Sequence, residues 1–186
     1  TITRLDVNEV ANLLDAVETG EKLSGRQKAF HERTKKRDLA LTTLLLGTGM
    51  RVSECVGINI RDLDFQNNAV RVTRKGGNEV FLFFGEEVRE ALEDYLEERK
   101  TAVTKDEKED ALFLSSQGKR INVRSVQNLV KKYSSGVTVK NISPHKLRST
   151  FGTNLYQETG DIYLVADALG HADVNTTRKH YAEVEE

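Results

Sequence analysis

The sequence has little of several residue types that would indicate a class at once. Cys55 is the single cysteine among 186 residues, so no disulfide can form within the chain, and this composition suits a reducing cytoplasm. There is one proline and no tryptophan. No apolar run approaches the roughly 20 residues that a membrane helix needs, because two threonines interrupt the longest candidate at 39–46. We therefore expect no membrane partner, and we interpret Cys55 as a packed hydrophobe.

An excess of one charge is also missing, since 28 basic and 29 acidic residues give a net charge of −1. Taken alone, that balance argues against a nucleic-acid partner. The distribution argues differently, because 119–148 holds eight Lys and Arg and no acid, whereas 86–110 holds eleven acids and five bases. Such segregation is typical of a protein that turns one face toward a polyanion. The acidic stretch by itself is more simply interpreted as a solvated helix and loop.

Motifs for metal ions and nucleotides are lacking as well. The chain has no P-loop, and the nearest candidate for a metal ligand set is the pair Asp62 and Asp64. These two carboxylates stand in a short segment at the edge of a predicted sheet, which favours a loop role. We expect no metal and no cofactor.

What the sequence does contain is mainly helical periodicity. Asp6 and Glu9 form a capping box before an amphipathic segment that continues to Val17. The polar stretch 21–36 is predicted to begin as a loop that runs into a helix, and further helical segments are predicted at 39–46, 51–56, 86–99, 122–133, 143–157, 161–169 and 175–184.

Three short alternating segments are typical of strands, namely 60–65, 69–73 and 79–83. Turn residues at 67–68 and 76–78 separate them, which predicts a small antiparallel sheet. Residues 111–114 are a candidate for one more short buried strand. The predicted fold class is therefore α+β, mainly α, with a small three-stranded antiparallel sheet.

A helix start at 143–148 brings a histidine and an arginine together. Ser143 and Pro144 are residue types favoured at the N-cap and first helical position. His145 and Arg148 are three residues apart and therefore share one face. The free N–H groups and the dipole of the first turn favour an anion there, and the planar guanidinium of Arg148 can hold two phosphate oxygens. Taken alone, an ordinary surface pair is the simpler interpretation.

Another arginine follows the glycine turn at 47–49. Arg51 stands between the apolar residues Met50 and Val52. Burying a guanidinium is costly unless an acid or a ligand compensates its charge, and Glu54 three residues later can orient it. A buried Arg–Glu pair without any ligand is the alternative.

Three more residues give little indication of function when each is considered alone. Lys75 precedes two glycines at a predicted hairpin tip, where it could be an ordinary exposed lysine. His171 follows the glycine that ends a predicted helix, and a structural role is the default. Tyr181 lies on the predicted helix 175–184, where a lone tyrosine is usually a packing residue.

Together, these residues resemble the tyrosine recombinase (phage-type integrase) family, and most of all the integrases of mobile elements. The resemblance is carried by Gly-Thr-Gly-x-Arg-x-Ser-Glu at 47–54, Lys75 on its hairpin, Pro-His-x-x-Arg at 144–148, Leu-Gly-His at 169–171, Thr-Thr at 176–177 and Tyr181. The segments follow one another in the family's order and span 47–181. The resemblance implies the family's catalytic-domain fold.

The resemblance also implies roles. Tyr181 would attack a DNA phosphodiester, form a 3′-phosphotyrosine and free a 5′-hydroxyl. Arg51 and Arg148 would stabilise charge on the phosphoryl oxygens, and Lys75 would protonate the leaving oxygen. His145 is similar to the family's acid/base histidine, His171 to the residue that hydrogen-bonds the phosphate, and Glu54 to the supporting acid. The basic residues expected to contact DNA are Lys119, Arg120, Arg124, Lys131, Lys132 and Lys146.

Elementary chemistry agrees with these roles. A phenol has a pKa of about 10 and needs cationic surroundings and a base before it can attack. Phosphoryl transfer depends mostly on positioning and electrostatics, which arginines, a lysine and a helix N-terminus can supply without metal.

Some features depart from the family's pattern. Asn78 and Glu79 follow the hairpin glycines where a second basic residue is usual, and Ser149 follows Arg148 where many members have histidine. Five residues trail Tyr181, whereas relatives often have a C-terminal segment that docks on a neighbouring protomer. DNA-clamping N-terminal domains are absent, so we interpret 1–186 as the C-terminal catalytic domain.

The expected function is site-specific recombination that integrates or excises a phage or transposon in a bacterial, nucleoid-associated setting. The expected partners are double-stranded DNA, three further protomers in a tetramer on paired sites, and accessory excision or DNA-bending proteins. Alternatives are a recombinase that resolves chromosome dimers, a type IB topoisomerase, a catalytically silent DNA-binding module and a metal-dependent nuclease.

Overall fold

The computed structural model describes residues 4–170. Its helices are α1 (Val7–Thr19), α2 (Gly25–Thr48), α3 (Val52–Val56), α4 (Glu86–Lys100), α5 (Val123–Ser134), α6 (Pro144–Thr159) and α7 (Ile162–Leu169), and its strands are β1 (Leu63–Asp64), β2 (Ala69–Thr73) and β3 (Glu79–Phe83). This confirms a mainly helical α+β fold with a small three-stranded antiparallel sheet.

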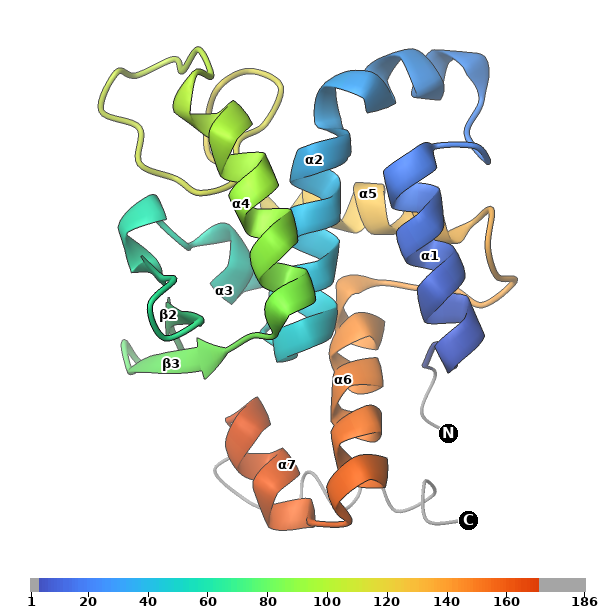
Figure 1. Cartoon of the computed structure of the whole chain (residues 1–186), viewed down its shortest axis with the longest axis vertical. Helices are drawn as coiled ribbons and strands as arrows, with labels where there is room; N and C mark the ends of the chain where they lie inside the picture. The colour runs from blue at the N-terminus through green and yellow to red at the C-terminus, as the bar shows by residue number, and fades with distance from the viewer. Residues whose placement is uncertain (1–3, 171–186) are drawn as a thin grey trace.

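Helix α2 is the central element, and α1, α4 and α6 pack around it (Figure 1). Its C-terminal half is rich in leucine, and Leu41, Leu44 and Leu45 are at most 1% exposed. Burial of side chains this size stabilises the fold by about 1.5–3 kcal/mol each. The helix ends at Gly49, whose left-handed backbone (φ 69°) lets its N–H donate to the carbonyl of Leu45.

The first half of α2 confirms that the polar stretch 21–36 begins as a loop and runs into a helix. Ser24 caps the helix and exchanges hydrogen bonds with Gln27 in a capping box, so the helix begins at Gly25 and most of 21–36 is helical. This half of the helix is largely exposed, which explains its polar composition. His31 and Thr34 are its buried exceptions, and Nε2 of His31 lies 2.6 Å from the carbonyl oxygen of Val17 on α1.

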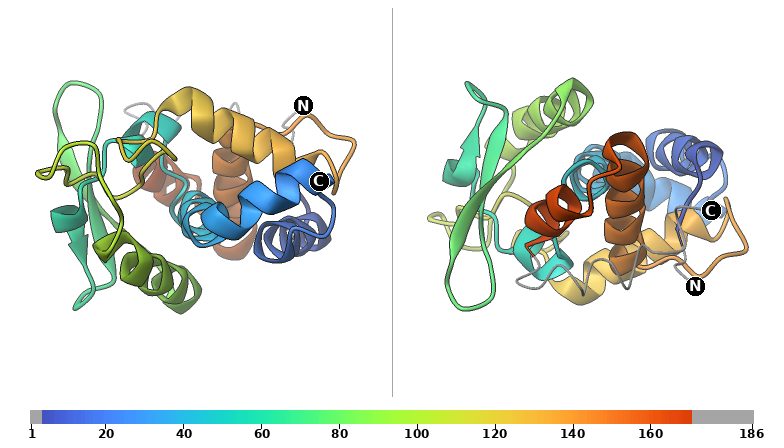
Figure 2. Two further views of the ribbon diagram at one scale, coloured as in Figure 1. Left: turned by 90° about the horizontal axis from the view of Figure 1, so that it is seen from above. Right: turned by 90° about the horizontal axis from the view of Figure 1, so that it is seen from below.

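The sheet has the order β1-β2-β3 and lies at one side of the helices (Figure 2). Val70 pairs with Leu82 and Val72 with Val80 on the face toward the core. The first predicted strand is mostly wrong, because Ile60–Asp62 is a 3-10 turn and β1 has two residues. The Asp62 carboxylate accepts from the N–H of Asn59 and so closes that turn.

The strand predicted at 111–114 is also wrong as a strand. It makes two isolated bridges, Asn59 with Ala111 and Leu114 with Arg120. Its four side chains are buried, which is why its composition resembled that of a strand.

Helices α6 and α7 form a smaller apolar cluster below the core. Val165 and Leu169 of α7 pack with Phe151 and Leu155 of α6. Seen from below, α7 lies between the sheet and α6 (Figure 2). This position brings the C-terminal end of α7 close to the turn after α2 and to the β2–β3 hairpin.

The structure also bears on the single cysteine and on the search for a membrane helix. Cys55 is fully buried and burial raises its pKa to about 12, which agrees with the interpretation as a packed hydrophobe. Across residues 4–170, no helix combines the length and the apolar character that a membrane crossing requires.

Candidate active site

The site is built around the buried carboxylate of Glu54. Its Oε1 accepts a hydrogen bond of 2.8 Å from the backbone N–H of Arg51. The Glu54 side chain therefore caps the N-terminus of its own helix, α3. Its Oε2 lies 3.6 Å from Nη1 of Arg51 and 3.8 Å from Nη1 of Arg74. One carboxylate that is 3% exposed therefore faces two guanidinium groups.

The structure brings Arg51 and Glu54 together as the sequence predicted, with one correction. The side chain of Arg51 is 43% exposed, so the guanidinium is not buried despite its apolar neighbours in sequence. Met50 turns into the core while Arg51, at the N-cap of α3, turns outward. The buried member of the pair is the acid, and the arginine is open to a ligand from solvent.

Arg148 comes to the same place from α6. Pro144 occupies the first turn as predicted, and Ser143 is the N-cap residue, although its side chain makes no capping hydrogen bond. Arg148 is 5% exposed, and it donates to the carbonyl oxygens of Gly49 (2.5 Å) and Leu169 (2.6 Å). It thereby ties α6 to both the α2–α3 turn and the end of α7.

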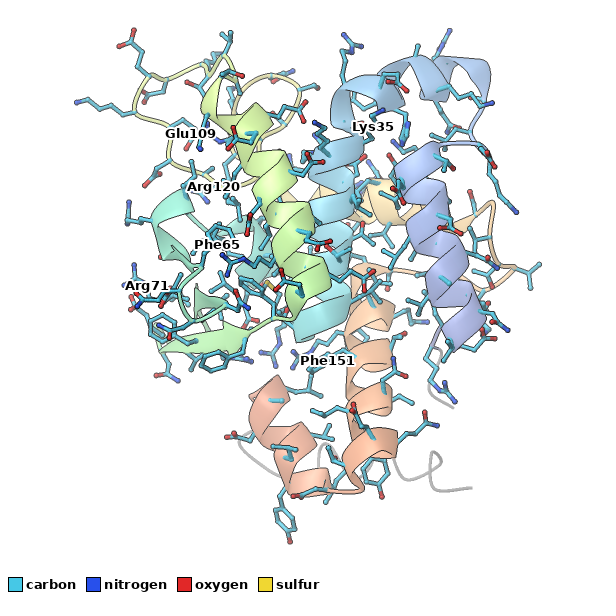
Figure 3. The ribbon with its side chains drawn as sticks, in the orientation of Figure 1. Lys35, Phe65, Arg71, Glu109, Arg120 and Phe151 are labelled. Atoms are coloured by element: carbon cyan, nitrogen blue, oxygen red, sulfur yellow. The ribbon has the colours of Figure 1, made fainter. Side chains whose placement is uncertain are left out.

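Gly49 shows how tightly this turn is packed. A Cβ at this position would lie 2.2 Å from Cδ2 of Phe151, which Figure 3 shows between the end of α2 and α7. Only a glycine allows α6 to approach so closely and also adopts the left-handed backbone. The glycine turn is thus required by the site's packing.

Lys75 lies on the β2–β3 turn and is exposed. The turn is closed by the backbone N–H of Arg74, which donates to the carbonyl of Asn78 (2.7 Å), and by Gly77, whose N–H donates to the carbonyl of Arg74. Gly76 and Gly77 both have positive φ, 87° and 84°. The hairpin predicted from those glycines is confirmed.

Arg74 is the site residue that sequence reasoning missed. It is 9% exposed, and its Nη1 and Nη2 donate to the carbonyl oxygens of Leu169 (2.7 Å) and Ala168 (3.2 Å). Strand periodicity could have indicated it, because Val70, Val72 and Arg74 alternate toward the core face. A buried cation at the end of such a series needs acceptors, and α7 supplies them.

These contacts join four segments that are distant in sequence. The Glu54 carboxylate links Arg51 and Arg74, and the Leu169 carbonyl oxygen accepts from both Arg74 and Arg148. Two guanidinium groups therefore face the Glu54 carboxylate, and a third, that of Arg148, shares the Leu169 carbonyl with Arg74. This excess of positive charge favours an anion at the site.

A cleft of about 510 Å³ opens beside Arg74 between β3, α6 and α7. The residues that line it are Thr48, Arg74, Asn78, Val80, Phe81, Leu82, Phe83, Phe151, Asp167, Ala168 and Gly170.

The remaining predicted residues divide into two groups. His145 is exposed on the first turn of α6, one turn before Arg148. His171 and Tyr181, and the helix predicted at 175–184, lie outside the described residues.

The six predicted DNA-contacting residues do not behave alike. Lys119, Arg124 and Lys131 are exposed, and Lys146 is half-buried. Arg120 donates to the carbonyl oxygens of Val56 and Ile58, so it is engaged within the protein.

Lys132 is half-buried, with Nζ 4.6 Å from the ring centre of Tyr133 and 5.4 Å from that of Phe30. Burial lowers its pKa. Its charge is therefore directed at aromatic rings of its own chain.

The aspartates considered for a metal have other partners. Asp62 binds Arg71 on β2 with bonds of 2.8 and 3.0 Å, and Asp64 accepts from the amides of Gln66 and Asn67. Within 4–170, no cluster of three or more His, Cys, Asp or Glu side chains has the arrangement to hold a metal ion.

A family model and curated relatives match most of the chain. A model of the phage integrase family matches residues 3–186. Tyrosine recombinase XerS of Streptococcus uberis is 37% identical over 175 residues, which are 91% of this chain and 49% of the relative. The chain thus spans about half the length of the curated relatives it matches.

Two solved structures have the same fold. XerH site-specific recombinase bound to palindromic difH substrate, a post-cleavage complex, has a TM-score of 0.78 and 25% identity, over 99% of this chain and 50% of XerH. The Tn1549 transposon integrase in complex with circular intermediate DNA has a TM-score of 0.73 and 21% identity, over 97% and 61%. The chain belongs to the phage integrase family of tyrosine recombinases.

Proposed function

We propose that this chain is the catalytic domain of a site-specific recombinase that cleaves and rejoins double-stranded DNA through Tyr181. The observation that carries the proposal is the convergence of Arg51, Arg74 and Arg148 around Glu54 and the end of α7. A phosphodiester is the anion that such a basic site, on a family member, would receive. Family membership supplies the nucleophile, which the described residues do not include.

The proposed reaction is a transesterification. The Tyr181 oxygen attacks phosphorus as its proton leaves to a base, for which His145 is the candidate. The P–O5′ bond breaks, and the 5′ oxygen takes a proton from the Lys75 ammonium. Arg51 and Arg148 stabilise the charge that builds on the non-bridging oxygens, an effect worth about 10²–10³ in rate for one such donor. The 3′-phosphotyrosine keeps the bond energy, so neither metal nor nucleotide is required.

The test uses a nicked duplex that carries the sequence this chain selects from a randomised pool. In EDTA, the wild-type chain is expected to form a covalent adduct on a denaturing gel, with the protein on the 3′ phosphate and a 5′-hydroxyl that a kinase can label. Tyr181→Phe is expected to form none. Tyr163→Phe, which changes an exposed tyrosine of α7, is the matched control and should behave as wild type.

Other outcomes would contradict the proposal. An adduct with Tyr181→Phe would assign the nucleophile elsewhere, and cleavage abolished by EDTA would indicate a metal-dependent nuclease. If the wild-type chain binds the selected duplex and never forms an adduct, a silent DNA-binding module is favoured. Relaxation of supercoils without any selected site would indicate a topoisomerase-like activity.

We further propose that the whole protein acts as a tetramer on paired sites in a bacterial nucleoid, with accessory excision or DNA-bending proteins. Two biological roles fit this assembly. Integration or excision of a mobile element is favoured by the ten-residue spacing between His171 and Tyr181. Resolution of chromosome dimers is favoured by the 37% identity to XerS, against 21% to the transposon integrase.

A plasmid assay separates the two roles. Resolution predicts deletion between two directly repeated copies of one selected site, without any excision factor. Integration predicts that recombination needs two different attachment sites and changes direction with an excision factor.

A further inference from the structure

Arg74 makes contacts that none of the expected roles explains. Its guanidinium is buried, yet its hydrogen bonds go to two main-chain carbonyls at the C-terminal end of α7. The last carbonyls of a helix have no partner within the helix and carry the negative end of its dipole. A cation placed there is favoured, so the contact stabilises both the charge and the helix end.

The same residue closes the hairpin that carries Lys75. The backbone N–H of Arg74 donates to Asn78 and its carbonyl accepts from Gly77, so Arg74 is the last paired residue before the turn. Lys75 follows directly, beside Gly76 and Gly77, which have positive φ and no side chain that could anchor the tip. The attachment of Arg74 therefore restrains the base of the segment that holds Lys75.

The contact is close as well as buried. A Cβ at Gly170 would lie 2.3 Å from Nη1 of Arg74, so the guanidinium is seated directly against the glycine that caps α7. Glu54 at 3.8 Å adds the charge partner that a buried arginine requires. Three elements, α3, the hairpin and α7, thus fix one side chain.

We propose that Arg74 is a positioning residue that fastens the Lys75 hairpin to the end of α7 and so places the Lys75 ammonium on the leaving 5′ oxygen. This inference rests on the proposed recombinase function. Arg74 itself keeps its carbonyl partners and does not contact the phosphate. A misplacement of about 1 Å can cost on the order of 10²-fold in rate, which is the scale of the effect expected.

The decisive substrate has sulphur in place of the bridging 5′ oxygen of the selected, nicked duplex. When the P–S bond breaks, the electron pair leaves on sulphur as a thiolate, which needs no proton because a thiol has a pKa of about 8.5. The oxygen substrate leaves as an alkoxide unless it is protonated. A defect in placing Lys75 therefore disappears with sulphur, whereas a defect in binding the phosphate or in folding persists.

Arg74→Ala is expected to cleave the oxygen substrate about 100-fold more slowly than wild type, at the lower end of the range for a lost general acid. With the sulphur substrate its rate should return to near that of wild type, as should the rate of Lys75→Ala. Arg74→Lys keeps the positive charge but loses the two-pronged guanidinium. Its cleavage rate on the oxygen substrate should lie between those of wild type and Arg74→Ala. Arg71→Ala, on the same strand but paired with Asp62, is the matched control and should cleave both substrates normally.

Two results would overturn the inference. An equal defect on oxygen and sulphur would mean that Arg74 contacts the phosphate or only holds the fold. A normal rate on oxygen would mean that the attachment does not matter for cleavage.

Hydrogen exchange of the free protein separates this inference from the proposed function. Arg74→Ala should raise exchange several-fold at Gly77 and Gly170, and should leave Leu45 in α2 unchanged. If the wild-type chain never forms an adduct, the recombinase assignment fails while this measurement still reports on the attachment. Unchanged exchange at Gly77 and Gly170 would contradict the attachment, whatever the DNA assays show.

Discussion

At the scale of single residues, the site depends on a few positions where two requirements meet. Gly49 must adopt a left-handed backbone and also leave room for the ring of Phe151. Glu54 must hold the N–H of Arg51 with one oxygen and face two guanidinium groups with the other. Gly49 has no side chain and that of Glu54 is buried. The surrounding atoms therefore have little room to adjust when either residue is replaced.

Gly49→Ala tests the first position. A non-glycine residue held in a sparsely populated backbone region costs of order 1–3 kcal/mol, and the clash with Phe151 adds to it. We expect the free energy of unfolding, measured in urea, to fall by at least about 2 kcal/mol with an unchanged m-value. Gly85→Ala is the control, because a Cβ there meets nothing within 4 Å, and a comparable loss in both variants would contradict the packing argument.

Residue patterns predicted which side chains meet better than how deeply each is buried. The spacing of Arg51 and Glu54 correctly paired them, but which of the two is buried depends on how Met50 turns into the core. Arg74 was missed because a helix from the other end of the chain provides its acceptors. A lone sequence gives no sign of such a contact beyond the alternation of β2.

At the scale of elements, caps and turns explain where the boundaries fall. The capping boxes at Asp6 and Ser24 both form, and they begin α1 and α2. The errors came where tertiary contacts decide the backbone, as at 60–62, where the N–H of Ile60 donates to Asp110. Short segments of this kind have too little periodicity of their own to be assigned.

The link between α1 and the loop before α6 predicts a dependence on pH. Lys140 donates to the carboxylate of Glu9 and lowers the pKa of that group to about 2 from its ordinary value of 4.5. A lowered pKa contributes stability that is present above pH 4.5 and is lost as the pH falls toward 2. Lys140→Ala should therefore be less stable than wild type at pH 6, with a difference that shrinks below pH 4.5.

Urea titrations at several pH values would measure this. Lys140 also donates to the carbonyl of Arg4, so part of its contribution is independent of pH. Glu9→Gln removes the titrating group alone and serves as the control. A difference between wild type and Glu9→Gln that stays constant from pH 6 to 2 would contradict the assignment.

At the scale of the whole molecule, the basic residues of 119–148 differ in whether their charges are exposed and can contact DNA. The acid-free stretch 119–148 includes exposed Lys131 and half-buried Lys132, which lies against two aromatic rings. Neighbours in sequence thus have different surroundings, and sequence alone could not separate them.

Charge reversal distinguishes the two lysines. Lys131→Glu should weaken binding to duplex DNA and flatten the slope of log K against log salt by about 1–2, with little change in stability. Lys132→Glu should lower the free energy of unfolding, because it places a carboxylate against the ring faces of Phe30 and Tyr133. Binding titrations at several salt concentrations, with urea denaturation of the same samples, measure both. An unchanged slope for Lys131→Glu would mean that this side of α5 does not face DNA.

The close seat of Arg74 against Gly170 has an evolutionary consequence. Gly170→Ala would lower stability for two reasons, the positive φ of 75° and the collision of the new Cβ with the guanidinium. Shortening residue 74 removes the collision and leaves the backbone penalty. The two substitutions should therefore show positive epistasis, so that the order in which they arise decides whether a lineage can pass through them.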